Sequence, residues 1–344
     1  MSATRLPAEW ELQSGLLLTW PHPQSDWRPF LQEIEPVYVD IVRQCVSRET
    51  VVISCLDDTH RTHVRDLLKS DGVSPANYRL YVAVSNDSWT RDHGPITVLH
   101  GDQPTLLDFT FNGWGNKYPS TLDNAITKTL YRQQAFGKTP LISLDFILEG
   151  GSLETDGLGT LLTTTSCLLS PQRNRSMDKI TLEDRLREYF CVDRIIWFEH
   201  GQLIGDDTDG HIDTLVRFAD AETLLYVASG NRNDPNYVAL EALKMELYKI
   251  RQRDGRPYRL TALPSPVIRN PAGDLLPASY ANFLFINDAV LIPLYGVDED
   301  KTAMEIFQRT FHDRAVIPIY CRPIINQFGS LHCITMQLPQ GVIE

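Results

Sequence analysis

The chain has 344 residues, with 32 lysines and arginines against 44 aspartates and glutamates, which gives a formal net charge of −12 at pH 7. This acidic balance disfavours a nucleic-acid-binding protein, which needs a basic face, and suits long-range attraction of a small cationic ligand. No apolar run approaches the roughly 18 residues of a membrane span, and the start lacks an apolar signal segment. We therefore expect a cytoplasmic protein without membrane or nucleic-acid partners.

Amphipathic stretches alternate with short apolar runs along the whole chain, a pattern that predicts a helix followed by a strand. One helix start is predicted at Thr181, which resembles a capping box with Asp184. The predicted pairs are 30–46 with 50–56, 59–70 with 79–84, 122–134 with 141–148, 181–190 with 194–198, 236–253 with 258–263, and 300–313 with 315–320.

The five or six copies of this unit are not separated by any low-complexity linker, so a single α/β domain over residues 1–344 is predicted. Polar, chemically capable residues follow four of the predicted strands, after Val84, Leu148, Phe198 and Tyr320. Because such residues follow the equivalent end of four predicted strands, we predict a pseudo-symmetric ring of these units with one central site.

The cysteines are widely spaced and form no CxxC pair, so reduced thiols are expected rather than a disulfide framework. They are Cys45, Cys55, Cys167, Cys191, Cys321 and Cys333. Cys333 lies in the segment GSLHCITMQLP, next to His332. If this segment is a strand, the two neighbouring side chains point apart, so a base for Cys333 has to come from elsewhere in the chain.

The segment GHIDTLVRF supplies the best candidate for that base. Its apolar alternation predicts a half-buried strand, which would place His211 and Asp213 on the same face. Two further acids stand out. Asp92 lies in WTRDHGP, where a turn or an ion pair with Arg91 is the alternative role, and Glu149 opens EGGS directly after a predicted strand.

A metal site is the rival interpretation of GDDTDGHID. Aligned to an EF-hand loop, this segment places Gly205 at position 1 and Val216 at position 12, where acidic ligands are required. Zinc-ligand spacings and phosphate-binding glycine motifs are also missing from the sequence. We therefore predict no metal and no cofactor, and we interpret Asp206, Asp207 and Asp209 as turn residues that could line an acidic mouth.

Together, the motifs PAEWE, TWPH, NDSWTRDHGP, DFTFNGWGNKY, LEGGS, DDTDGHIDTLVRF and GSLHCITMQLP resemble those of the agmatine deiminases, in the same order and over residues 7–339. These enzymes belong, with bacterial peptidylarginine deiminases, to the guanidine-modifying superfamily. The resemblance implies a five-bladed α/β propeller (pentein fold) and hydrolysis of agmatine to N-carbamoylputrescine and ammonia without a cofactor. A homo-oligomer is suggested by the family alone.

The resemblance also assigns roles residue by residue. Cys333 matches the nucleophile, His211 the catalytic histidine, Asp92 and Asp213 the guanidinium-binding aspartates, and Glu149 the family's glutamate. Trp89 matches a motif tryptophan; Trp89, Trp114 and Tyr118 could stack on a cation or pack in the core or in a lid. Since carboxylates disfavour a thiolate, we expect a neutral Cys333 thiol at rest, which a bound cation helps to ionise.

The sequence departs from the family pattern at two places that bear on how the tail of the substrate is recognised. Asn326, Gln327 and Phe328 stand where the family has a run of glycines, although Gly329 is kept, and the segment 111–124 is shorter than in plant-like members. The competing functions are deimination of peptidyl-arginine or free arginine, and a non-catalytic guanidine-binding protein.

Overall fold

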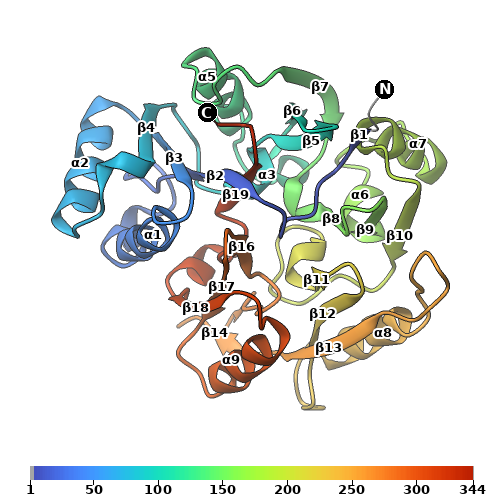
Figure 1. Ribbon diagram of the computed structural model, residues 1–344. Helices are drawn as coiled ribbons and strands as arrows, with labels where there is room; N and C mark the ends of the chain where they lie inside the picture. Colours follow the sequence, from blue (N-terminus) through green and yellow to red (C-terminus); the bar gives the residue numbers. More distant parts are fainter. Residues whose placement is uncertain (1–3, 344) are drawn as a thin grey trace.

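The computed structural model describes residues 4–343. Within them, five sheets of three or four strands surround a common centre, and the longer helices lie at the periphery (Figure 1). With strands in spatial order, one four-stranded sheet contains β1 (Thr4–Arg5), β5 (Ile96–His100), β6 (Gln103–Thr110) and β7 (Leu141–Ile147), and the other contains β19 (Thr335–Pro339), β2 (Gln13–Thr19), β3 (Thr50–Cys55) and β4 (Tyr78–Val82). The first two three-stranded sheets are β10 (Arg194–Phe198), β9 (Thr160–Thr164) and β8 (Glu154–Thr155), and β11 (Val216–Asp220), β12 (Thr223–Ala228) and β13 (Arg259–Pro264). The third is β16 (Leu284–Ile286), β17 (Ala289–Leu294) and β18 (Ala315–Tyr320). A small extra sheet pairs β14 (Ile268–Arg269) with β15 (Leu275–Leu276).

The same pairing recurs in all five of these sheets. A central strand has an antiparallel neighbour on one side and a parallel neighbour on the other, as in β5–β6–β7 and β16–β17–β18. Each parallel neighbour is reached through a helix, which supplies the crossover that parallel strands need. These helices are α1 (Leu31–Cys45), α2 (Asp58–Ser70), α5 (Ile126–Arg132), α7 (Lys179–Phe190), α8 (Tyr237–Leu247) and α9 (Glu299–Thr310).

The hydrophobic pattern explains this architecture. The central strands β12 and β17 are nearly continuous buried apolar runs, and β2 is buried around Leu16, Leu17 and Leu18, as expected for strands covered on both faces. The outer helices are amphipathic; α1, for example, buries Ile34, Tyr38, Ile41, Val42 and Cys45, a spacing that keeps one face toward the sheet.

The predicted helix and strand pairs are confirmed, with two corrections. Helix α8 ends at Leu247, because the chain turns through Asp254 and Gly255, whose φ is +88°, on the way to β13. Helix α7 begins at Lys179 and not at Thr181. Asp178 is its N-cap, and the Asp178 carboxylate accepts a hydrogen bond from the backbone N–H of Thr181.

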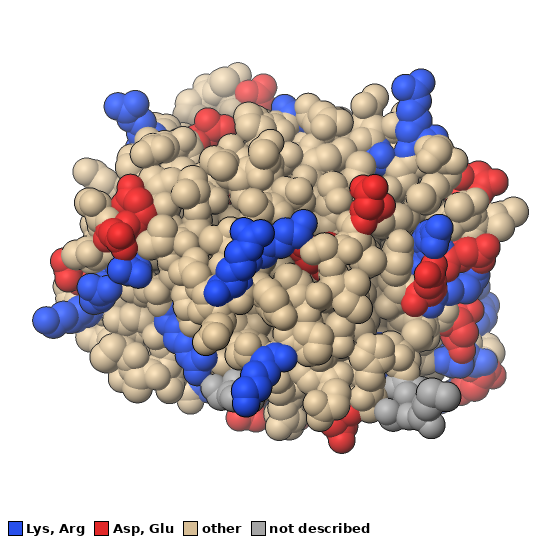
Figure 2. Space-filling view, turned by 90° about the horizontal axis from the view of Figure 1, so that it is seen from above, with Lys and Arg blue, Asp and Glu red and all other residues tan. Residues whose placement is uncertain are grey.

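All six cysteines are free thiols, as the sequence predicts. Among residues 4–343, no helix has the length and apolar character needed to cross a lipid bilayer. On the face shown in Figure 2, basic and acidic side chains are scattered, and neither sign forms a continuous band.

The segments that follow the last strand of each large sheet carry the polar residues singled out in the sequence. They leave β4, β7, β10 and β18 and reach the centre of the ring. A fifth segment follows β13 and ends at β16. Side chains far apart in the sequence therefore converge on one central site.

Candidate active site

Two of the acids lie at short helical turns in the segments that follow strands β4 and β7. Asp92 is on the one-turn helix α3 (Thr90–His93), and Glu149 immediately precedes the 3₁₀ turn Gly150–Ser152. The alternative ion pair between Asp92 and Arg91 is not formed: the Arg91 guanidinium lies 3.9 Å from Glu9, and Asp92 accepts a hydrogen bond from the indole N–H of Trp114 at 3.0 Å.

His211 and Asp213 share one side of the chain, but the predicted strand is wrong. They lie at a 3₁₀ turn over Ile212–Thr214, and β11 begins only at Val216. A turn forms here in place of a strand ladder, because the backbone carbonyl of His211 accepts hydrogen bonds from the Thr214 hydroxyl at 2.9 Å and from the Thr214 backbone N–H at 3.4 Å.

Gly151 shows how closely these residues meet. A Cβ atom on this glycine would lie 2.6 Å from Nδ1 of His211, 2.9 Å from Oδ1 of Asp92 and 3.2 Å from Oδ2 of Asp213. Only a glycine leaves room for the three side chains at this point. The Gly151 N–H also donates to Asp92 at 3.0 Å.

Cys333 also lies in a turn, ahead of β19, and not in the strand that the sequence predicts. Its Sγ is 3.4 Å from Oδ1 of Asn282 and 3.9 Å from Oδ2 of Asp213. The neighbouring His332 is occupied elsewhere: Nδ1 is 2.7 Å from Asp213 and Nε2 is 2.7 Å from Glu9. The expectation that His332 is a poor base for Cys333 agrees with this geometry.

Sequence reasoning missed Asn282. Its amide N–H group donates to Asp213 at 3.2 Å, while its carbonyl accepts from the backbone N–H of His332 at 2.8 Å. Asn282 therefore ties the turn that carries the cysteine to the aspartate beside it. The available signal was positional, since Asn282 lies beyond the predicted strand 258–263, one of the two copies of the unit that had no assigned site residue.

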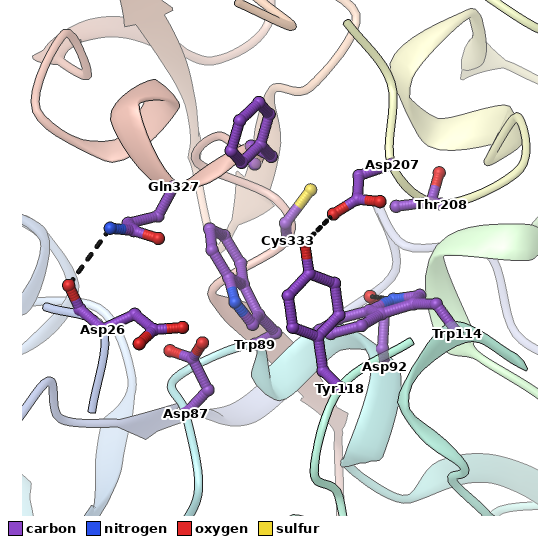
Figure 3. A pocket seen from close by; sticks show the side chains of 12 residues that line it. Asp26, Asp87, Trp89, Asp92, Trp114, Tyr118, Asp207, Thr208, Gln327 and Cys333 are labelled. Carbon is purple, nitrogen blue, oxygen red and sulfur yellow. Dashed lines mark hydrogen bonds between the residues drawn. The ribbon is translucent and has the colours of Figure 1, made fainter. Parts of the chain in front are cut away.

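Trp89, Asp92, Trp114 and Cys333 line a cavity of about 220 Å³ (Figure 3). His211, Asp213 and Glu149 lie behind this lining and are fully buried. Among residues 4–343, no hydrogen bond reaches Oδ1 of Asp213 or either ring nitrogen of His211, although Asp92 lies 3.6 Å from Nδ1 and Glu149 lies 3.9 Å from Nε2. Because buried polar atoms are normally paired, these atoms are available to a polar ligand that reaches past Asp92 and Cys333.

The departures from the family pattern lie on the same cavity. Gln327 and Phe328 line it, and Phe328 adopts the left-handed backbone region with φ at +66°. Gly329 is kept for a steric reason, since a Cβ there would lie 2.1 Å from the Trp89 ring. The short segment 111–124 contributes Trp114 and Tyr118 to the opposite wall.

Glu149 is held by a residue that the sequence reasoning did not single out. Nε of Arg173 lies 2.9 Å from each carboxylate oxygen of Glu149, and Nη1 of Arg173 is 2.7 Å from Asp209. Cys167 lies 3.9 Å from Glu149 on another side. Within the described residues, the ligand atoms of Glu149, Cys167 and His211 lie within 4.8 Å of one another, and these three are the group that could hold a metal.

Burial and charge set the protonation of the site. Burial raises the pKa of Asp92 to about 6. Burial alone would lower the pKa of His211, but the Asp92 carboxylate, 3.6 Å from its Nδ1, raises it well above the ordinary value. Burial and the charges of Asp213 and Asp92 raise the pKa of the Cys333 thiol well above its ordinary value. These pKa shifts favour a neutral Cys333 thiol and a protonated His211 imidazole in the free site.

A bound guanidinium should lower the pKa of Cys333, because a cation next to the sulfur stabilises the thiolate. Alkylation of Cys333 by iodoacetamide, followed peptide by peptide with mass spectrometry across a pH series, should reach its midpoint at lower pH when methylguanidine is present. Cys191, which is exposed and outside the cavity lining, is the internal control. An unchanged midpoint for Cys333 would contradict the idea that bound cation ionises the thiol.

Solved structures with the same arrangement define the class of protein. A Porphyromonas gingivalis protein provisionally named an arginine deiminase is 44% identical, with a TM-score of 0.92 over 99% of this chain and 100% of that one. A cysteine-to-serine variant of C. jejuni agmatine deiminase with substrate bound is 34% identical, with a TM-score of 0.91 over 99% and 98% of the two chains. The chain is an enzyme, a hydrolase of the deiminase type.

The family follows from the sequence profile of the Porphyromonas-type peptidyl-arginine deiminases, which matches residues 5–339. The chain belongs to this family. Among curated relatives, a Pectobacterium atrosepticum protein provisionally named an agmatine deiminase is 31% identical over 97% of this chain and 94% of its own length.

Proposed function

We propose that this enzyme hydrolyses agmatine to N-carbamoylputrescine and ammonia, with Cys333 as nucleophile and without a cofactor. One observation carries the proposal: a thiol on the cavity wall, two carboxylates and a buried imidazole meet around Gly151 and Asn282. The names of the relatives given above support the choice of agmatine as substrate. We also propose that the five large sheets are the blades of a single-domain pentein propeller.

The residue types fit a guanidinium, which is planar, delocalised and permanently charged. Carboxylates accept its N–H groups in short, charge-assisted hydrogen bonds, and we propose that Asp92 and Asp213, which meet at Gly151, do so here. An ion pair with Arg173 holds Glu149 in place. The Glu149 carboxylate contributes negative charge behind His211, since Oε2 of Glu149 lies 3.9 Å from Nε2 of His211. The rings of Trp89 and Trp114 give the cation flat walls, and Trp114 also fixes Asp92.

The proposed reaction has two stages. The Cys333 thiolate, after release of its proton to solvent, attacks the guanidinium carbon, and protonated His211 gives its proton to the departing amine, so that ammonia leaves and an S-alkylthiouronium remains on the sulfur. Neutral His211 then takes a proton from water as the hydroxide adds to that carbon. The C–S bond breaks, the thiolate is restored, and the hydroxyl proton of the adduct leaves to solvent, where ammonia takes it up.

Ammonia release from agmatine, free arginine and a blocked arginine peptide, measured side by side, tests the proposal. We expect kcat/KM for agmatine to exceed that for either arginine substrate by at least about 100-fold, which corresponds to a difference of about 2.7 kcal/mol. A preference for the blocked peptide would favour the peptidyl-arginine activity that gives the family its name. No turnover of any of the three would favour a non-catalytic guanidine-binding protein.

A further inference from the structure

The charges of the cavity lining are unbalanced. Four of the twelve lining residues are aspartates, and none is lysine, arginine or histidine. Asp92 lies next to the Trp114 indole at the inner end, where the guanidinium is proposed to bind. The lining residues are Asp26, Asp87, Trp89, Asp92, Trp114, Tyr118, Asp207, Thr208, Gln327, Phe328, Gly329 and Cys333.

Asp26 and Asp87 form a second acidic group in the cavity. Figure 3 shows their carboxylates close together, on the side of the Trp89 ring away from Asp92 and Cys333. Both residues line the same cavity. They come from different parts of the chain: Asp26 precedes the first long helix, α1, and Asp87 follows β4.

Neither of these two carboxylates belongs to an ion pair between residues 4 and 343. Asp87 accepts hydrogen bonds from neutral donors, the Trp27 indole N–H and the Ser88 backbone N–H, each at 2.8 Å. Burial, with a further contribution from Asp26, raises the pKa of Asp87 to about 6. Asp207, in contrast, lies 3.9 Å from Nζ of Lys117 and accepts a hydrogen bond from the Tyr118 hydroxyl.

Asp26 and Asp87 are neighbouring carboxylates without a cation. Behind the inner end of the same cavity, buried atoms of His211 and Asp213 lack a hydrogen bond within residues 4–343. The two acidic groups together are complementary to a ligand with two separate positive charges. We propose that Asp26 and Asp87 bind a distal ammonium group of the substrate, so that the enzyme selects guanidines that carry a second cation over those with a neutral or acidic tail. This proposal rests on the guanidine deimination proposed above.

The rest of the cavity suits the link between the two charges. The Trp89 ring separates the two acidic groups, so a short alkyl chain can lie against it, and Gly329 allows the ring to stay in place. Gln327 helps to position the pair of Asp26 and Asp87, because its side-chain amide donates to the backbone carbonyl of Asp26 at 3.1 Å. The α-carboxylate of free arginine would face the same two aspartates without a counterion, which disfavours its binding.

Paired substrates isolate the tail charge. Agmatine and n-pentylguanidine have the same chain length, but the second carries a methyl group where the first carries the ammonium. For Asp87→Asn and for Asp26→Asn, we expect kcat/KM with agmatine to fall about 10- to 100-fold, the scale of a hydrogen bond to a charged group, while kcat/KM with n-pentylguanidine stays within about twofold.

Controls separate this inference from the proposed function. Asp184→Asn changes the net charge equally on an exposed side chain of α7 and should leave both substrates unaffected. Because Asp26 is exposed, Asp26→Asn tests the idea even if the Asp87 variant folds poorly. Equal losses on both substrates, or no loss in folded variants, would overturn the tail subsite alone. A wild-type enzyme that converts neither substrate would overturn the proposed function.

Discussion

Cys333→Ser should abolish turnover while leaving the protein folded. A serine hydroxyl is a far weaker nucleophile than a thiolate, and the neighbouring His332 is not free to act as its base, since it is bound to Asp213 and Glu9. We expect kcat for agmatine to fall at least about a thousandfold. The serine is nearly isosteric and can donate to Asn282 as the thiol does, so the denaturant midpoint should stay close to that of the wild type.

Cys167 is the competing thiol, because it lies beside Glu149 and His211, whereas Cys333 lies on the cavity wall. The two can be told apart by trapping the covalent intermediate during turnover and mapping the modified peptide by mass spectrometry. The added mass should be on the peptide with Cys333. An adduct on the Cys167 peptide, or full activity in Cys333→Ser, would reject the assignment. Exposed Cys191→Ser is the control for the loss of a thiol.

Arg217→Leu should destabilise the fold more than any surface change. Arg217, on β11, is fully buried; its Nε is 2.6 Å from Glu154, its Nη2 is 2.8 Å from Glu9, and its Nη1 donates to the Phe283 carbonyl at 2.8 Å. Leucine would leave the buried Glu154 carboxylate without its cation and Glu9 with only the more distant Arg91, at 3.9 Å. Breaking a buried ion pair in this way costs about 3–5 kcal/mol of the free energy of unfolding.

Urea unfolding of Arg217→Leu checks this, with Arg256→Leu as the matched control. Arg256 pairs with Asp254 and Glu222 but is 61% exposed, so its loss should change the free energy of unfolding by about 0.5 kcal/mol or less. Similar effects of the two variants would contradict a structural role for the buried network. The network also supports the site, since Glu9 holds His332, which in turn holds Asp213.

The sequence predicted the repeated helix and strand units because they depend on local hydrophobic periodicity, which the core then uses directly. It also indicated that the ends of several strands carry the chemistry, and the residues named there, Asp92, His211, Asp213 and Cys333, do converge. Its errors were local ones. His211 and Asp213 lie at a turn in which the Thr214 hydroxyl donates to the His211 carbonyl. Cys333 lies in a turn held by Asn282, whose side-chain carbonyl accepts from the backbone N–H of His332; these contacts replace the strand that apolar alternation predicts.

The sequence by itself therefore determined the layered α/β architecture, the free thiols and the set of chemically capable residues, since each follows from residue type and spacing along the chain. Only the tertiary structure decided which of them touch. Four residues gain their roles from partners that are 50 or more positions away or at the end of another strand: Asn282, Arg173, Asp26 and Asp87. No local pattern in the sequence encodes such a contact. The physical reason is that their energies come from burial and pairing, which exist only once the sheets have assembled around the centre.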